Sequence, residues 1–174
     1  YSHGLTTTSG GNISLKVSDN IIALTPSATD KGNMKWEEVG LLTLEGENLT
    51  PDLKPSIEEE MHLSIYRKKK EISAIVHAHP MFASAFTAMK CTISTDLTAE
   101  AKAICGDPCF VPYALMGTRE LASIASESIL KSDILLLENH GILTTGSSIL
   151  QAFDKLEVLE NAAKMSMIVE LTGK

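Results

Sequence analysis

The sequence contains few of the features that mark disulfide-stabilised, membrane-spanning or nucleic-acid-binding proteins. Its three cysteines, Cys91, Cys105 and Cys109, are an odd number without CxxC spacing, which argues against a disulfide framework and against a structural zinc knuckle. No apolar run approaches the roughly 18 residues that span a bilayer, and no signal peptide opens the sequence. We therefore expect a cytoplasmic protein with no membrane partner.

Positive charge is also scarce. The 174 residues include 15 Lys and Arg against 22 Asp and Glu, which gives a net charge of −7 at pH 7. The one basic cluster, at residues 67–70, is short and closes a predicted helix, where cations interact favourably with the helix dipole. This argues against a nucleic-acid partner. Hydrophobic residues make up 44% of the chain, enough for one core, and we expect residues 1–174 to form a single domain.

Short strand-like segments alternate with helical ones along the chain. Apolar runs and alternation predict strands at 12–17, 21–25, 39–44, 72–80, 111–113, 133–137 and 142–145. Helical spacing predicts helices from residue 56, at 81–89, within 92–104, at 117–130 with Thr118 as N-cap, and at 147–171. This order favours an α/β fold in which helices cover the faces of a mixed sheet.

Histidine is rare, with five residues, and most of them can be placed in one site. The segment ISAIVHAHP at 72–80 predicts a buried strand, and residues two apart on a strand point to the same side, so His77 and His79 share a side. His140 follows the second buried strand, at 133–137. If the two strands end on the same side of one sheet, three imidazoles converge. Alternatively, His77 and His79 are simply solvated polar residues at a strand end.

A carboxylate can complete such a site. Ser56 is a natural N-cap, with Glu59 placed three residues later as in a capping box. Most glutamates in an acidic first turn only compensate the helix dipole. Glu58 differs because it shares a helix side with His62. We interpret Glu58 as a metal ligand that can also act as a general base, and His62 as a supporting residue, although the pair could also supply competing ligands.

Three neutral imidazoles with one carboxylate suit zinc or a similar divalent ion. His3 lies in the opening segment, and we assign it no role. The loop TTTSGGNIS at 6–14 places glycine N–H groups beside Ser9 and Asn12, where they could hold a phosphate or merely form a turn.

Six motifs follow one another along the chain: SGGNIS at 9–14, LTPSA at 24–28, KPSIEEEMHLSIY at 54–66, AIVHAHP at 74–80, VPYALMGTRELA at 111–122 and LENHGILTTG at 137–146. In this order and spacing they resemble the class II aldolase/adducin family. The resemblance implies a three-layer α/β sandwich with a mixed, largely antiparallel sheet. It also implies an opening helix that precedes residue 1, and a homotetramer with its active sites at subunit boundaries.

The resemblance also implies roles for single residues. His77, His79, His140 and Glu58 match the family's zinc ligands, with manganese or cobalt as alternative ions, and Glu58 also matches its acid/base. A second group of residues matches the loops that hold the substrate phosphate: Ser9, Gly11, Asn12, Ser27 and Ser56. The family's aldolases use a tyrosine from the neighbouring subunit for proton transfer. This chain has Thr98 at that position, and Glu100, two residues on, is the nearest titratable candidate for the same role.

The chain departs from the family's aldolases at two places in the loops that hold the substrate phosphate. The aldolases have two consecutive serines where this chain has Ser56 and Ile57, and Thr-Gly where it has Ser27 and Ala28. We expect a zinc-dependent aldolase that cleaves a short ketose 1-phosphate, of the L-fuculose 1-phosphate type, into dihydroxyacetone phosphate and an aldehyde. The alternatives are an epimerase, decarboxylase or dehydratase acting on a related sugar phosphate or sugar acid, and a non-catalytic adducin-like assembly domain.

Overall fold

The computed structural model describes residues 1–173, which form one seven-stranded sheet, five α-helices and a short 3-10 helix at Trp36–Glu38. The strands are β1 (Asn12–Ser18), β2 (Ile21–Leu24), β3 (Gly40–Thr43), β4 (Ala74–Ala78), β5 (Cys109–Val111), β6 (Ile134–Leu137) and β7 (Gly141–Gly146). The helices are α1 (Glu59–Lys68), α2 (Met81–Met89), α3 (Ala99–Cys105), α4 (Arg119–Ser128) and α5 (Ile149–Leu171). Over the described range, no helix is both long and apolar enough to cross a bilayer.

The strands are ordered β3-β2-β1-β4-β7-β6-β5 across the sheet. Every neighbouring pair is antiparallel except β5 with β6. Short turns join β1 to β2 and β6 to β7, as antiparallel neighbours allow. The expectation of an α/β domain with a mixed, largely antiparallel sheet is therefore confirmed.

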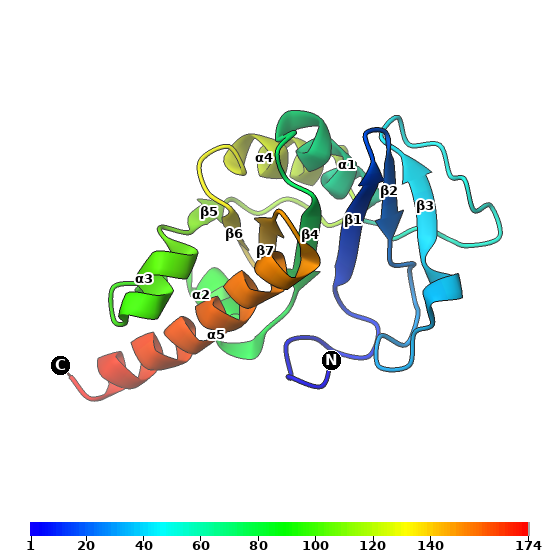
Figure 1. The fold of residues 1–174 in the computed structure, drawn as a ribbon. Helices are drawn as coiled ribbons and strands as arrows, with labels where there is room; N and C mark the ends of the chain where they lie inside the picture. Colours follow the sequence, from blue (N-terminus) through cyan, green and yellow to red (C-terminus); the bar gives the residue numbers. More distant parts are fainter. Residues whose placement is uncertain (174) are drawn as a thin grey trace.

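Helices cover both faces of the sheet (Figure 1). Helices α1 and α4 pack together on one face, over a core that includes Ile75 and Leu135. Helices α2, α3 and α5 lie on the other, over a second core with Val76 and Leu136. Because both faces are covered, β4 and β6 are buried at every position and read in the sequence as continuous apolar runs.

The start of α1 differs from the prediction. Thr118 caps α4 as expected, since its side chain accepts a hydrogen bond from the Leu121 N–H. Ser56 as the N-cap of α1 is wrong, because the helix begins at Glu59 and Glu58 occupies the cap position. The Ser56 hydroxyl instead accepts from the Glu58 N–H (3.2 Å) and so supports the turn that precedes the helix.

The predicted strand at 111–113 is displaced by two residues. In the structure, β5 covers Cys109–Val111 and pairs in parallel with β6, with Cys109 opposite Leu135. Pro112 has no N–H to donate and cannot continue the ladder, which explains why the strand ends at Val111.

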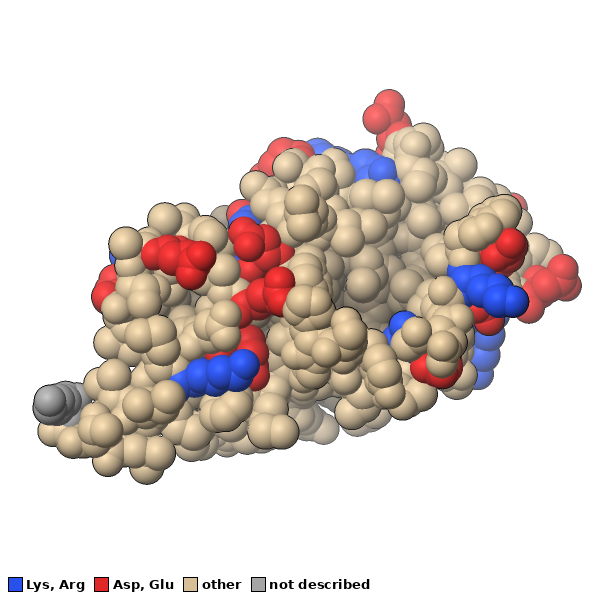
Figure 2. All heavy atoms as spheres, turned by 60° about the horizontal axis from the view of Figure 1, so that its bottom comes forward, with Lys and Arg blue, Asp and Glu red and all other residues tan. Residues whose placement is uncertain are grey.

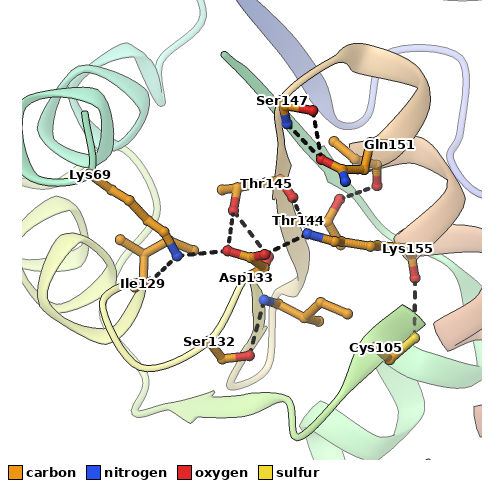
Figure 3. A network of polar contacts seen from close by, with 12 residues as sticks. Lys69, Cys105, Ile129, Ser132, Asp133, Thr144, Thr145, Ser147, Gln151 and Lys155 are labelled. Carbon is orange, nitrogen blue, oxygen red and sulfur yellow. Dashed lines mark hydrogen bonds and ion pairs between the residues drawn. The ribbon is translucent and has the colours of Figure 1, made fainter. Parts of the chain in front are cut away.

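An ion cluster closes the end of the sheet at which β4 and β6 begin (Figure 3). Asp133 accepts from Lys69 through Oδ1 and from Lys155 through Oδ2, each over 2.6 Å, and Lys155 also donates to the Thr145 carbonyl. Burial would raise the pKa of Asp133, but the two lysines outweigh it and lower that pKa. The carboxylate therefore joins the end of α1, the start of β6 and helix α5.

We expect Asp133→Asn to lower the free energy of unfolding at pH 7 by about 1–3 kcal/mol, since it leaves two largely buried lysines without a counter-charge. Because the pKa of Asp133 is lowered in the folded state, its contribution is present above the unfolded value of about 3.9 and is lost as pH falls through the folded value. Urea unfolding measures both effects. Asp96→Asn is the control, since Asp96 pairs with Lys102 at an exposed site and should change stability by less than about 0.5 kcal/mol. Equal losses in both variants would contradict the prediction.

Candidate metal centre

Three imidazoles meet where β4 ends and β7 begins. Because these strands are antiparallel neighbours, the end of β4 lies beside the start of β7, with Ala78 opposite Ile142. His77 ends β4 together with Ala78, His79 follows it, and His140 lies in the turn directly before β7. The ligand atoms of the three histidines lie within 4.8 Å of one another. The structure thus brings His140 next to two histidines from which it is separated in sequence by strands β5 and β6.

Two glycines allow this close approach. A Cβ on Gly141 would lie 2.5 Å from His79 Cδ2 and 2.6 Å from the Ala78 carbonyl oxygen. Gly11 has φ +67°, and a Cβ there would lie 2.6 Å from the carbonyl oxygen of His77. Any other residue at these positions would push the histidine-bearing backbone outward.

Hydrogen bonding leaves one nitrogen of His77 free for a metal ion. The ring is buried, and its Nδ1 donates to the Ile142 carbonyl over 2.8 Å. Its Nε2 then faces His79 Nε2 at 3.1 Å and Glu58 Oε2 at 3.3 Å. Burial lowers the pKa of His77 to about 4 and also lowers the pKa of His79. Both rings are therefore neutral at pH 7, which is the form that binds metal.

Glu58 brings a carboxylate to the same point. It is buried, and its Oε1 lies 3.3 Å from His140 Nε2, whereas Oε2 is the oxygen that faces His77. Burial alone would raise the pKa of Glu58, but the imidazoles of His77 and His140 and the amide of Asn12 lower it instead. Asn12 Nδ2 donates to Oε2 over 2.8 Å. Oε1, in contrast, has no hydrogen-bond partner among the described residues.

This donor set fits a divalent metal ion. Two ligand atoms of tetrahedral zinc lie ~3.3 Å apart, because each is about 2.0–2.1 Å from the ion. The contacts of Glu58 with His77 and His140, both 3.3 Å, and that of His77 with His79, 3.1 Å, are close to this separation. The unpartnered Oε1 would gain a cation as its partner. The four residues predicted as metal ligands are therefore compatible with one site.

A chain of buried hydrogen bonds lies behind Glu58. His62, on α1, contacts Asn12 Oδ1 through Nε2 and Ser14 Oγ through Nδ1. The hydroxyl of Tyr66 lies 3.0 Å from Ser14 Oγ. Burial lowers the pKa of His62 to about 3, so this ring is also neutral at pH 7. His62 does not belong to the cluster of three histidine ligand atoms.

A cavity of about 180 Å³ opens beside the histidines. Its lining contains all five residues predicted to bind the substrate or its phosphate, together with three of the predicted metal ligands: Ser9, Gly11, Asn12, Ser27, Ser56, Glu58, His79 and His140. The Asn12 side chain is already committed to His62, Ser56 and Glu58. Any contact that Asn12 makes with a ligand therefore depends on its backbone or on giving up one of these bonds.

Six further residues of the cavity lining were not predicted as site residues: Gly10, Pro26, Ala28, Lys31, Ile57 and Met116. Lys31 Nζ donates to the Pro26 carbonyl over 2.8 Å. Burial lowers the pKa of Lys31, with no opposing contribution from a carboxylate among the described residues. A signal for Lys31 was present in the sequence, since it follows the LTPSA motif by only three residues.

Glu100 does not join this cluster within one chain. It is exposed in the first turn of α3, where Thr98 is the N-cap and accepts from the Ala101 N–H. Helix α3 packs on the face that α5 covers, whereas Asn12 pairs with His77 on the face of Ile75 and α1. A role for Glu100 at such a site would require a second copy of the chain, and it stays a prediction.

Comparison with known proteins places these residues in context. The family described as "Class II Aldolase and Adducin N-terminal domain" matches residues 1–167. An L-fuculose phosphate aldolase of Methanococcus vannielii is 38% identical over 161 residues, which cover 92% of this chain and 86% of that protein. A 3-oxo-tetronate 4-phosphate decarboxylase of Haemophilus influenzae is 34% identical over 172 residues, covering 95% and 80% respectively. The solved structure of an L-fuculose 1-phosphate aldolase is similar with a TM-score of 0.92 and 30% identity, covering 99% of this chain and 82% of that one.

We expect the purified protein to bind one divalent ion per chain, and His140→Ala to weaken that binding by at least about 100-fold. Loss of a supporting residue alone costs about 10–100-fold, and His140 offers a direct ligand atom. Metal analysis after dialysis against a weak chelator measures the occupancy. His3→Ala is the matched control, because His3 is exposed and pairs with Glu157, and it should keep the full metal content. Equal metal content in both variants would rule out the site.

Proposed function

The chain belongs to the family of class II aldolase and adducin N-terminal domains, and from this premise we propose that it is a zinc-dependent aldolase. Its substrate would be a short ketose 1-phosphate of the L-fuculose 1-phosphate type, and its products dihydroxyacetone phosphate and an aldehyde. The observation that carries this proposal is the buried Glu58 facing three imidazoles at one end of a hydroxyl-lined cavity. The aldolase relatives support it.

The chemistry needs an acid/base and a means of stabilising negative charge. When the bond between C3 and C4 of the ketose breaks, its electron pair moves toward the carbonyl, and the C4 hydroxyl loses a proton. A divalent ion held by His77, His79 and His140 would offset the charge that develops on the substrate oxygens. Glu58, with Oε2 held by Asn12 and Oε1 without a partner, is placed for proton transfer.

An anionic substrate suits the rest of the cavity. Lys31 places a cation in the same lining as the hydroxyls of Ser9, Ser27 and Ser56, and among the described residues no carboxylate contributes to its pKa. Ala28 keeps a positive φ of 54°, so the loop retains the backbone conformation that a glycine would favour. These two features support a phosphate group on the substrate despite the absence of a second serine at Ile57.

Decarboxylation is the alternative that a specific observation favours. The H. influenzae relative carries the name of a decarboxylase and is similar over nearly the whole chain. Both reactions build negative charge on the same kind of oxygen, so one charge-stabilising site can serve either, and the same holds for an epimerase or dehydratase. A non-catalytic, adducin-like assembly role is less well supported, because the ligand set is complete.

A homotetramer with active sites at its subunit boundaries is part of the proposal. Ile57 and Met116 line the cavity and are 52% and 54% exposed, and Tyr113 and Leu115 nearby are similarly exposed. Figure 2, which views the molecule from the side of α2 and α5, shows broad uncharged areas between its acidic and basic groups. Apolar groups at the mouth of a cavity favour a covering surface, and a second copy of the chain would also deliver Glu100.

The free thiols of Cys91, Cys105 and Cys109 suit the cytoplasm, where we place the protein.

Incubation with a panel of ketose 1-phosphates should release dihydroxyacetone phosphate, detected by NMR, while the unphosphorylated sugars react poorly. We expect Glu58→Gln to lower kcat by about 10²–10⁴-fold, because a neutral amide cannot accept the proton. Glu60→Gln, two residues along the same segment, is the control and should retain activity, since Glu60 contacts Ser64 and Arg67 instead. Release of CO₂ without dihydroxyacetone phosphate would show the decarboxylase, and borohydride trapping of substrate on a lysine would overturn the metal mechanism.

Glu100→Gln should lower kcat by about 10²-fold if Glu100 serves the neighbouring copy. Co-expression of Glu100→Gln with Glu58→Gln chains should then restore activity at about a quarter of the sites, because random mixing pairs an intact Glu58 with an intact neighbouring Glu100 at that frequency. Size-exclusion chromatography with light scattering checks that the mixed species is a tetramer. No recovery on mixing would place Glu100 outside the active site.

A further inference from the structure

The hydrogen-bond chain behind Glu58 has a defined direction. A carboxylate oxygen can only accept, so Asn12 must turn its NH₂ group toward Glu58 Oε2, at 2.8 Å. The carbonyl oxygen of the same amide then faces His62 Nε2. That nitrogen must carry the proton, because two acceptors cannot form a hydrogen bond with each other. The ionised Glu58 thus determines the orientation of Asn12 and the tautomer of His62.

The far side of His62 is consistent with that tautomer. With the proton on Nε2, the Nδ1 atom is free to accept, and the Ser14 hydroxyl lies 2.6 Å from it. The Ser14 hydroxyl also lies 3.0 Å from the hydroxyl of Tyr66, which donates to the Ser73 carbonyl over 3.3 Å. Each group in this buried series, from Ser14 through His62 and Asn12 to Glu58, therefore donates to the next. Such a fully satisfied network holds its members in one arrangement, since reversing any member leaves buried polar atoms unpaired.

We propose that His62 is a positioning residue that acts on Glu58 through Asn12. By donating to Asn12 Oδ1, His62 keeps the NH₂ group of Asn12 on Glu58 Oε2 and so leaves Oε1 as the free oxygen of the carboxylate. The inference rests on the proposed function, because it assigns His62 a purpose at the metal centre rather than in folding alone.

Loss of His62 would affect Glu58 because the side-chain amide of Asn12 would lose a hydrogen-bond donor. Among the described residues, His62 is the donor that Asn12 Oδ1 contacts, so its removal leaves a buried carbonyl oxygen without a partner. The amide can then rotate and direct its oxygen toward Glu58, where two acceptors repel each other. Glu58 would lose its support at Oε2 and its defined orientation toward His77 and His140. Supporting residues of this kind affect metal affinity by about 10–100-fold.

Two substitutions separate the ring's hydrogen-bonding role from its bulk. His62→Gln places an NH₂ group near the position of the original Nε2 and can still donate to Asn12. His62→Asn is too short to reach Asn12, although it remains polar. We expect His62→Asn to weaken binding of Co²⁺, followed through its visible absorption, by about 10–100-fold, and His62→Gln to stay within about threefold of the wild type. Equal weakening in both variants would overturn the proposal.

A double substitution tests whether the effect passes through Asn12. Asn12→Ala should weaken Co²⁺ binding, and adding His62→Asn to it should cause no further loss, because the intermediary is already absent. Full additivity of the two effects would contradict the proposal. Ser166→Ala is a control for general destabilisation, since Ser166 is buried and its hydroxyl contacts Ser94 and the Ala162 carbonyl, none of which belongs to the hydrogen-bond chain behind Glu58. It should bind Co²⁺ like the wild type.

A measurement on the unaltered protein keeps the inference testable if a variant fails to fold. ¹⁵N NMR of the full chain should show His62 with its proton on Nε2 and none on Nδ1, and the opposite tautomer would overturn the inference. The outcomes also separate the two proposals. A wild-type protein that binds no Co²⁺ would contradict the proposed function, whereas equal binding by wild type and His62→Asn would contradict only the role of His62.

Discussion

The antiparallel pairing of β4 with β7 is the constraint on which the candidate metal centre depends. It places the end of one strand beside the start of the other, so histidines 61 to 63 positions apart in the chain become neighbours. A slip of one residue would turn His77 away from Glu58 and toward the opposite face. The alternation of Ile75 and Val76 between two separate cores opposes such a slip, because each side chain would exchange its packing partners. The apolar core thus determines where the polar site lies.

A buried polar site requires supporting interactions, and the structure provides them at both ends of the sheet. Near the histidines, Asn12 satisfies one oxygen of Glu58 and His62 satisfies Asn12. At the other end, Asp133 lies between Lys69 and Lys155 and connects α1 with α5. The first cluster includes His62 near the start of α1, and the second includes Lys69, the residue that follows the end of α1. The helix is therefore held near both of its termini. A helix held in this way keeps Glu58, its N-cap residue, in a constant position relative to the sheet.

The sequence predicted those parts of the fold that depend on local pattern. Buried apolar runs located β4 and β6, and Thr118 was recognised as a cap because capping involves residues only three apart. The HxH spacing and the histidine after the second buried strand predicted convergence of the rings only on the condition that both strands end on the same side of one sheet. The structure fulfils this condition, because β4 and β6 both pair antiparallel with β7. The start of α1 was mispredicted because Ser56 interacts with Asn12, 44 residues away, which no local rule can include. The contacts of His62 and the placement of Lys31 in the cavity depend on tertiary structure in the same way.

The cavity of one chain combines strongly polar and exposed apolar surfaces. The histidines and Glu58 lie at a largely buried end, whereas Ile57 and Met116 are more than half exposed at the rim. Burying apolar surface contributes about 25 cal/mol per Å², so covering this rim would favour association of two chains. The same covering would exclude water from the region where charge develops, and electrostatic stabilisation is stronger in a drier site. Assembly and catalysis would therefore be linked by one surface, because the contact that stabilises the oligomer would also complete the environment that the reaction needs.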